Sequence, residues 1–529
     1  MAEIRHILFI MCDQLRWDYL SCYGHPHLHT PNIDGLATEG VRFDNAYVQS
    51  PICGPSRMSF YTGRYASSHG STWNNTPLNA GEYTLGDYLK PLGWRNVLVG
   101  KTHMRADEEG MARLGVEADS VIGVHVSQCG FEPFERDDGL HPGSGRSEPA
   151  YNTYLREHGF DSENPWHDWA NAGVDPETGD VASGWFMKHA NLAARVPEEH
   201  SETPYMTRRA MDFIRHAGDD PWCLHLSYIK PHWPYIVPAP YHDMYGAKDI
   251  VAPVRSSAER QSPHPVYRAF MNHRDSKAFS RDGVRERVLP AYMGLIKQID
   301  DQMGVLFEFL KTQGLWDDTL IVFTSDHGDY LGDHWLGEKE LFHQCAVRIP
   351  MIIRDPRKQA DATRGKAEPR LVEAIDLVPT FVEAAGAEPQ MQRLEGRSLM
   401  PLLAGEAPKW RELVVSEYDY AQRDASLELR VPPARARIYM VADNRWKYIY
   451  YEGFPAQLFD RENDPDELVD LGESDEHASV RDAMKEHLFA WARHLKSRTT
   501  VSDDEIAASA GYDKSADAGL YIGWWDENG

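Results

Sequence analysis

Four short apolar runs, each followed at once by polar residues, form the clearest pattern along the chain. The runs are Ile7–Met11, Asn96–Gly100, Trp222–Tyr228 and Leu320–Thr324. Near-continuous apolar runs of this length, separated by helical stretches, are typical of strands buried on both faces of a parallel sheet. Ligands of such sheets bind beyond the carboxyl ends of the strands. The pattern therefore predicts an α/β fold in which the four runs deliver polar residues to one shared site.

A long helical pattern lies just before the fourth run. Apolar residues recur at helical spacing from Tyr292 to Leu310, which predicts a core-facing helix. Between about 130 and 290 the chain is rich in Pro, Gly, Trp and His and has weak periodicity, so we predict long insertions around the site. Residues 1–405 should form one large domain.

The character of the chain changes after about residue 405. Two apolar runs, Ala436–Ala442 and Arg445–Tyr451, are separated by Asp443-Asn444 and predict a hairpin. A helical pattern follows from residue 480 to 495. We predict that residues 406–529 form a smaller α+β domain with an antiparallel sheet.

The last apolar segment of the chain, residues 519–525, indicates association. Its sequence, GLYIGWW, is too apolar for a free tail, so we expect it to dock on its own body or on a partner subunit. A homodimer or homotetramer is the oligomeric state that this segment favours.

Composition and charge exclude several classes of partner. The 529 residues carry a formal net charge of -26, which disfavours binding to nucleic acid or to an anionic membrane. An anionic substrate would need a local positive patch. The apolar run near the N-terminus is too short for a signal peptide, and no run approaches the roughly 20 apolar residues of a membrane span. The six cysteines contain no CxxC pair, so a reduced, cytoplasmic setting is predicted.

The first candidate catalytic residue is Cys53, in the run C-G-P-S-R. A lone cysteine after such a turn is ordinarily a buried structural thiol. Arg57 follows one helical turn later, and T-G-R closes the segment at residues 62–64. The apolar runs add polar residues of the metal-ligand and acid–base types at their ends, namely Asp13, Lys101, His103, Lys230, His232, Asp326 and His327.

Together these motifs resemble the signature of type I sulfatases and phosphonate monoester hydrolases, which belong to the alkaline phosphatase superfamily. Lys339 and the run Leu458-Phe459-Asp460 extend the resemblance, which covers roughly residues 5 to 475. It implies an alkaline-phosphatase-like sandwich with a large, mostly parallel central sheet and a smaller C-terminal α+β domain with an antiparallel sheet. It also implies that a formylglycine-generating or other maturation enzyme oxidises Cys53 to formylglycine. The hydrated aldehyde would then attack sulfur or phosphorus in a small-molecule ester.

The resemblance implies a site for one divalent metal ion. Its ligands would be Asp13, Gln14, the oxidised residue 53, Asp326 and His327. Many members of the family have a second aspartate in place of Gln14 and an asparagine in place of His327. Oxygen ligands suit Ca²⁺, whereas the imidazole makes Mn²⁺ equally credible, so both ions stay open.

The remaining roles also follow from the resemblance. The catalytic set would be Cys53, Arg57, Lys101, His103, His232 and Lys339, and the substrate-binding set Asn74, Lys101, His232 and Lys339. Positive charge would stabilise the transition state, with Arg57 holding the residue-53 diol rather than the substrate. His232 is the candidate general acid and His103 the candidate base. Asn75, beside Asn74, leaves the choice of asparagine open.

Four functions remain possible at this stage. Hydrolysis of sulfate monoesters, promiscuous towards phosphonate monoesters and phosphodiesters, agrees with Lys101 and His103. Phosphonate monoester or phosphodiester hydrolysis as the main activity agrees with Gln14 and Asn74. A two-metal phosphatase would need a second ligand set, for which only Asp333-His334 is a candidate. An inactive relative that serves as a binding protein would retain Cys53 as an unmodified thiol.

Overall fold

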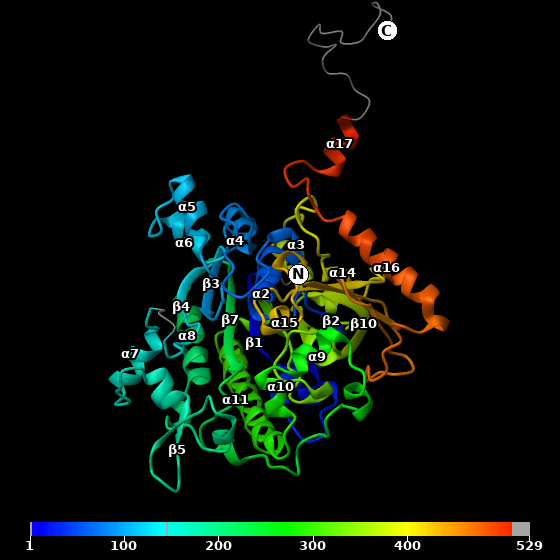
Figure 1. The fold of residues 1–529 in the computed structure, drawn as a ribbon. Helices are drawn as coiled ribbons and strands as arrows, with labels where there is room; N and C mark the ends of the chain where they lie inside the picture. Colours follow the sequence, from blue (N-terminus) through cyan, green and yellow to red (C-terminus); the bar gives the residue numbers. More distant parts are fainter. Residues whose placement is uncertain (1–2, 144–146, 510–529) are drawn as a thin grey trace, which may run out of the picture.

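The four apolar runs are strands at the centre of one large sheet (Figure 1). The computed structural model describes residues 3–143 and 147–509. The strands are β1 (His6–Asp13), β3 (Arg95–Gly100), β7 (Trp222–Pro231) and β8 (Thr319–Ser325). They lie side by side in the order β8-β1-β7-β3, and every neighbouring pair is parallel. Their carboxyl ends therefore meet at one edge of the sheet, as the sequence predicts.

Four outer strands complete an eight-stranded sheet in the order β10-β2-β9-β8-β1-β7-β3-β4. They are β2 (Val41–Tyr47), β4 (Glu132–Arg136), β9 (Arg348–Arg354) and β10 (Lys366–Glu373). Only β9 runs antiparallel to its neighbours, β8 and β2. The predicted α/β fold with a large, mostly parallel sheet is confirmed.

Both faces of the sheet are buried, because successive side chains of each strand point to opposite faces. In β1, Ile7, Phe9 and Met11 pack into one apolar cluster, while Leu8 and Ile10 pack into another. The first cluster includes residues of helices α2 (Cys53–Thr62), α4 (Leu85–Leu89) and α13 (Leu377–Ala384). The second includes residues of helices α1 (Pro31–Glu39), α8 (Glu202–His216) and α11 (Val284–Thr312). This two-sided burial explains why the strands are apolar throughout.

The predicted core helix is confirmed as α11, which buries its apolar stripe against the sheet. Helix α8 belongs to the same layer but lies within the part of the sequence that has weak periodicity. Its buried face includes Glu202, Thr203 and Thr207 beside apolar residues, so hydrophobic spacing alone gives a poor signal there.

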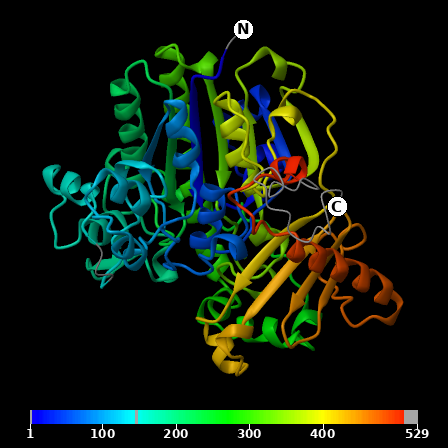
Figure 2. The same ribbon diagram turned by 90° about the horizontal axis from the view of Figure 1, so that it is seen from above.

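A second sheet follows in the C-terminal part of the chain and has four antiparallel strands (Figure 2). These are β11 (Val414–Asp419), β12 (Arg437–Ala442), β13 (Trp446–Tyr451) and β14 (Gln457–Asp460). Strands β12 and β13 are the predicted hairpin.

The late helical pattern forms α16 (Ala478–Arg493), which packs Met484 and Leu488 against one face of this second sheet. The other face contributes Met440 and Ile449 to the cluster shared with the large sheet. The boundary at residue 405 stays a prediction. Residues 519–525 lie outside the described part of the chain.

Within residues 3–143 and 147–509, no helix has both the length and the apolar character that a membrane span requires. The cytoplasmic setting stays a prediction.

Candidate active site

The carboxyl ends of the four central strands carry the residues that the sequence singled out. Asp13 is the last residue of β1, and Lys101 directly follows β3. His232 follows β7, while Asp326 and His327 follow β8. Asp13, Asp326 and His327 are completely buried, and Lys101 is 5% exposed. The topology therefore brings residues that are up to 314 positions apart in sequence, 13 to 327, to one place.

Helix α2 adds Cys53 and Arg57 to this place. The two residues lie four positions apart, and therefore on the same face of the helix. Pro55 stands in the first turn, where its missing N–H removes no helical hydrogen bond. Gly63 ends the helix at φ 69°, a left-handed conformation that glycine adopts readily. All ten residues of the helix are buried, so the position of residue 53 is fixed on every side.

Asp13, Cys53, Asp326 and His327 form a compact group that could hold a metal ion. Their ligand atoms all lie within 4.8 Å of one another. Cys53 Sγ is 3.0 Å from His327 Nε2 and 3.6 Å from Asp13 Oδ1. His327 Nδ1 donates to the carbonyl of Gly328 at 2.8 Å, which leaves the Nε2 lone pair directed at the group. Two carboxylates and one imidazole, with an oxygen at residue 53 after oxidation, fit one divalent cation such as Ca²⁺ or Mn²⁺.

Two cationic side chains hold the carboxylates in place. Arg57 Nε lies 2.8 Å from Asp326 Oδ2, and its Nη2 lies 3.1 Å from Asp13 Oδ2. Lys101 Nζ is 2.5 Å from the same Asp13 oxygen. Burial alone would raise the pKa of Asp13, but the charges of Lys101 and Arg57 hold it well below its usual range. The Asp13 carboxylate is therefore ionised and available as a ligand.

Arg57 contacts the candidate metal ligands and the residues around them, and it is not exposed to solvent. Its Nη1 donates at 2.8 Å both to the carbonyl of Lys101 and to Ser227 Oγ, and its side chain is 0% exposed. Arg57 thus contacts the candidate metal ligands Asp13 and Asp326, and its role in holding the residue-53 diol stays a prediction. Ser227 was not predicted, although a polar residue inside the apolar run of β7 was an available signal.

Gln14 links the metal group to Lys339. Its backbone N–H donates to Asp326 Oδ1 at 3.0 Å. Its side-chain Nε2 donates to Tyr235 and Asp329, so the carbonyl Oε1 faces Lys339, whose Nζ lies 2.8 Å away. Tyr235 and Asp329 were not predicted, but Asp329 lies in the run D-H-G-D that begins at Asp326.

The two candidate proton-transfer residues are half-buried on the border of the group. His232 Nδ1 donates to the carbonyl of Trp233 at 3.0 Å, which leaves Nε2 for other partners. Burial, and after it the charge of Lys339, holds the pKa of His232 well below its usual range. His103 is fixed through its backbone N–H, which donates to Asp138 at 2.7 Å. Its buried Nδ1 has no hydrogen-bond partner within the described residues.

Asn74, rather than Asn75, adjoins the turn at Cys53. Its Oδ1 accepts a hydrogen bond from the backbone N–H of Gly54 at 2.7 Å. A Cβ at Gly54 would lie 2.9 Å from that oxygen and 3.1 Å from the Asn74 Cα, so glycine permits this close approach. Asn75 is exposed.

The Asp333-His334 pair does not form a second metal site. Asp333 lies 2.6 Å from Arg16. The ring of His334 stacks on His343 with centroids 3.8 Å apart, and its Nδ1 is 2.8 Å from Glu259. Across residues 3–143 and 147–509, the group around Asp13 is the one set of three or more His, Cys, Asp or Glu side chains with metal-binding geometry. This finding weakens the two-metal alternative.

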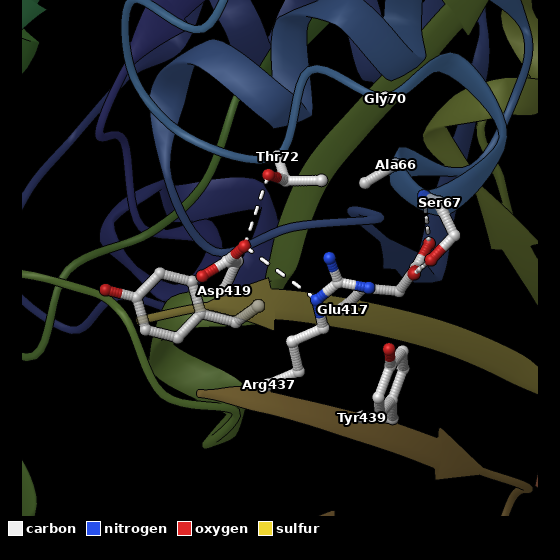
Figure 3. A pocket seen from close by; sticks show the side chains of 9 residues that line it. Ala66, Ser67, Gly70, Thr72, Glu417, Asp419, Arg437 and Tyr439 are labelled. Carbon is white, nitrogen blue, oxygen red and sulfur yellow. Dashed lines mark hydrogen bonds and ion pairs between the residues drawn. The ribbon is translucent and has the colours of Figure 1, made fainter. Parts of the chain in front are cut away.

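A separate cavity of about 220 Å³ lies between α3 (Ala66–His69) and the strands β11 and β12 (Figure 3). Glu417 accepts a hydrogen bond there from the backbone N–H of Ser67 at 3.0 Å. Asp419 accepts one from Thr72 Oγ1 at 3.3 Å. The predicted catalytic, metal and substrate residues are absent from its lining.

Comparison with known proteins places the chain in a family. The sulfatase family model matches residues 5–387, and a model of the C-terminal part of N-sulphoglucosamine sulphohydrolase matches residues 332–494. The multifunctional alkaline phosphatase superfamily protein PehA of Trinickia caryophylli is 31% identical over 523 residues, covering 94% of this chain and 96% of that protein. The choline-sulfatase of Rhizobium meliloti is 28% identical and covers 89% and 82%.

The fold gives the same assignment. The phosphonate monoester hydrolase SpPMH from Silicibacter pomeroyi superimposes with a TM-score of 0.82 at 26% identity, covering 94% of this chain and 98% of that one. The family match spans most of the chain and includes every predicted site residue. The protein therefore belongs to the sulfatase family of hydrolases, within the alkaline phosphatase superfamily.

Proposed function

We propose that the protein hydrolyses sulfate monoesters of small molecules through a formylglycine formed from Cys53 and one divalent metal ion. We further propose that it accepts phosphonate monoesters and phosphodiesters. The observation that carries the proposal is the position of Cys53 Sγ within the buried group of Asp13, Asp326 and His327. A divalent ion bound there would supply positive charge to the non-bridging oxygens of the ester.

The unmodified cysteine is poorly suited to attack an ester. Burial and the neighbouring Asp13 carboxylate raise the pKa of Cys53 to about 12. The thiol is therefore protonated at neutral pH, and a protonated thiol is a weak nucleophile. This supports conversion of Cys53 by a maturation enzyme before the protein becomes active.

The protein's own side chains supply binding and proton transfer. Lys339 and Lys101 both act electrostatically on residue 53 and would hold the anionic ester, together with Asn74, which accepts a hydrogen bond from Gly54. His232 would act as the general acid through Nε2. Its Nδ1–H bonds the Trp233 carbonyl and its low pKa keeps the free ring neutral, so Nε2 must gain a proton before it can protonate the leaving oxygen. His103 would take a proton from the hydrated residue 53.

A second function is favoured by the overall fold. The close likeness to SpPMH supports phosphonate monoester or phosphodiester hydrolysis as the main activity. The ratios of kcat/KM for p-nitrophenyl sulfate, a p-nitrophenyl phosphonate and bis(p-nitrophenyl) phosphate decide between the two.

The test compares protein made with and without a formylglycine-generating enzyme. Mass spectrometry should show the replacement of the Cys53 CH₂SH group by CHO, and only that form should turn over the esters. Chelation should abolish activity, and re-addition of Mn²⁺ or Ca²⁺ should restore it. Cys53→Ala should lower kcat by at least about 10³-fold, whereas Cys22→Ala, outside the site, should leave kcat unchanged. Full turnover by Cys53→Ala would refute the proposal.

Assembly and location belong to the same proposal. We infer a homodimer or homotetramer in the cytoplasm, on the strength of the apolar residues 519–525 and the reduced cysteines. Light scattering on protein truncated after residue 509 tests the first point, since loss of the apolar segment should yield a smaller assembly.

A further inference from the structure

The loop that carries Lys339 holds two glutamates in backbone conformations that favour glycine. The φ angle is +63° at Glu338 and +102° at Glu340. A residue with a Cβ atom is disfavoured in this region, because the side chain crowds the following carbonyl group. Conformations of this kind persist where the surrounding structure imposes them, and they cluster at functional sites. The conformations of Glu338 and Glu340 therefore point to a functional role for the side chains beside Lys339.

The two glutamates have different surroundings. The side chain of Glu340 is 9% exposed, and its Oε2 lies 2.9 Å from Arg423 and 4.0 Å from His273. Arg423, whose own side chain is 30% exposed, thus pairs with this buried carboxylate. The side chain of Glu338 is 24% exposed, and its Oε2 lies 3.3 Å from Lys339 Nζ. Glu338 is thus the carboxylate of this loop that reaches solvent.

Two residues, Lys339 and Gln14, connect Glu338 to the metal group. The Lys339 ammonium that it contacts also donates to Gln14 Oε1 at 2.8 Å, and Gln14 bonds Asp326 through its backbone. Lys339 itself is 7% exposed, and Gln14 and Asp326 are 0% exposed. Along this line of contacts, Glu338 is the most exposed residue.

An aromatic ring, that of Trp233, lies near the Lys339 loop. Trp233, the residue after His232, is half-buried, and its ring lies 4.4 Å from Tyr235 and 6.2 Å from Phe279. The Lys339 loop packs on that same Phe279, since a Cβ at Gly337 would lie 2.6 Å from its ring. Trp233 and the Lys339 loop thus share Phe279 as a neighbour, and a carboxylate and an indole are the groups that attract an organic cation.

We propose that Glu338 determines substrate specificity, favouring esters whose leaving group carries a positive charge and disfavouring those with a second negative charge. This inference rests on the proposed function and names a substrate class for it. Glu338 offsets part of the Lys339 charge, so a monoanionic sulfate ester or phosphodiester can still bind, whereas a dianionic phosphate monoester meets repulsion. A cationic leaving group gains attraction from the same carboxylate.

The test uses two aryl sulfates of matched shape, one bearing a meta trimethylammonium group and the other a meta tert-butyl group. The change in the ratio of their kcat/KM values between the natural protein and a variant isolates the effect of the Glu338 charge, because the difference in leaving-group reactivity is common to both proteins. Glu338→Gln should lower the cationic-to-neutral ratio by about tenfold, as expected for loss of one charge several ångströms away at a partly exposed position. The same variant should raise kcat/KM for p-nitrophenyl phosphate.

Two further variants keep the result interpretable. Glu338→Gly removes the carboxylate and suits the positive φ, so it should fold at least as well as the natural protein and give the same fall in ratio. Asp317→Asn changes the net charge equally at a side chain that is 96% exposed and remote from the site, and should leave the ratio unchanged.

The outcomes separate the inference from the function on which it rests. An unchanged ratio in both Glu338 variants, with normal turnover of the neutral sulfate, overturns the inference and leaves the proposed function intact. Loss of turnover of both sulfates in these variants would make Glu338 essential to catalysis and would also overturn it. Absence of sulfate turnover in the matured natural protein would instead contradict the proposed function.

Discussion

Arg57 joins the two carboxylates of the metal group, and the effect of its removal can be worked out from its contacts. The side chain is 0% exposed and pairs with Asp13 and Asp326, which are also 0% exposed. Arg57→Met keeps an unbranched apolar stem but removes the guanidinium. Lys101 would still contact Asp13 at 2.5 Å, so Asp326 is the carboxylate that loses its cation.

The expected loss of stability follows from the Asp326 carboxylate, which would stay buried without its cation. Removing one partner of a buried ion pair costs about 3–5 kcal/mol, because the other charge stays buried without compensation. The Lys101 carbonyl and Ser227 Oγ also lose a donor, at about 1–3 kcal/mol for each acceptor left unsatisfied. We therefore expect Arg57→Met to lower the free energy of unfolding by at least about 4 kcal/mol without metal. A bound divalent ion would supply the missing charge, so the loss should be clearly smaller with metal.

The assay is urea unfolding followed by tryptophan fluorescence, in chelator and in saturating Mn²⁺. Arg445→Met is the matched control, because Arg445 pairs with Asp460 at 2.7 Å but is 46% exposed. Pairs of that kind contribute about 0–1 kcal/mol. The reasoning fails if Arg57→Met costs no more than this control, or if metal leaves its cost unchanged.

Two more predictions concern Lys339 and the cavity between α3 and β11. Lys339→Ala should lower kcat/KM for the sulfate ester by about 10²–10³-fold, because the proposal assigns this buried cation to ester binding. Steady-state kinetics with unchanged circular dichroism would confirm the prediction, and normal turnover would exclude the role. Burial raises the pKa of Glu417 from 4.5 to about 7. Between these two pH values the folded protein holds a proton that the unfolded protein releases. The free energy of unfolding should therefore fall as the pH rises from about 4.5 to about 7. Glu417→Gln should remove this contribution to the pH dependence of stability and should stabilise the protein at pH 8 by at most about 3 kcal/mol. Urea unfolding at pH 5 and pH 8 measures both effects. An equal change in stability between the two pH values in both proteins would contradict the prediction.

The sequence was informative wherever burial imposes a regular pattern. Strands β1 and β8 are buried on both faces, so their apolar runs are uninterrupted and the polar residue that ends each run stands out. Parallel strands end at the same edge of a sheet, and this geometric rule placed Asp13 and Asp326 together across more than 300 residues. The position of the metal group was thus predictable, because it depends on strand ends.

Contacts made by loops gave no comparable signal. Gln14, His103 and Glu338 adopt positive φ angles without being glycine, and no turn motif announces them. The bonds from Gln14 to Tyr235 and Asp329 join segments 221 and 315 residues apart, so neither spacing nor hydropathy could reveal them. The choice between Asn74 and Asn75 likewise depends on which amide lies against Gly54.

The charge arrangement of the site explains how a protein with a net charge of -26 can bind an anion. Asp13 and Asp326 already face Lys101 and Arg57 inside the protein, so the two carboxylates and the two cations offset one another. The positive charge of a divalent ion held by this group would consequently stay uncompensated and would attract the anionic ester. Lys339 adds one more positive charge, which Glu338 partly offsets from the solvent side. These cations act at short range inside the protein, whereas salt screens the charges of the exposed acidic surface over about 10 Å.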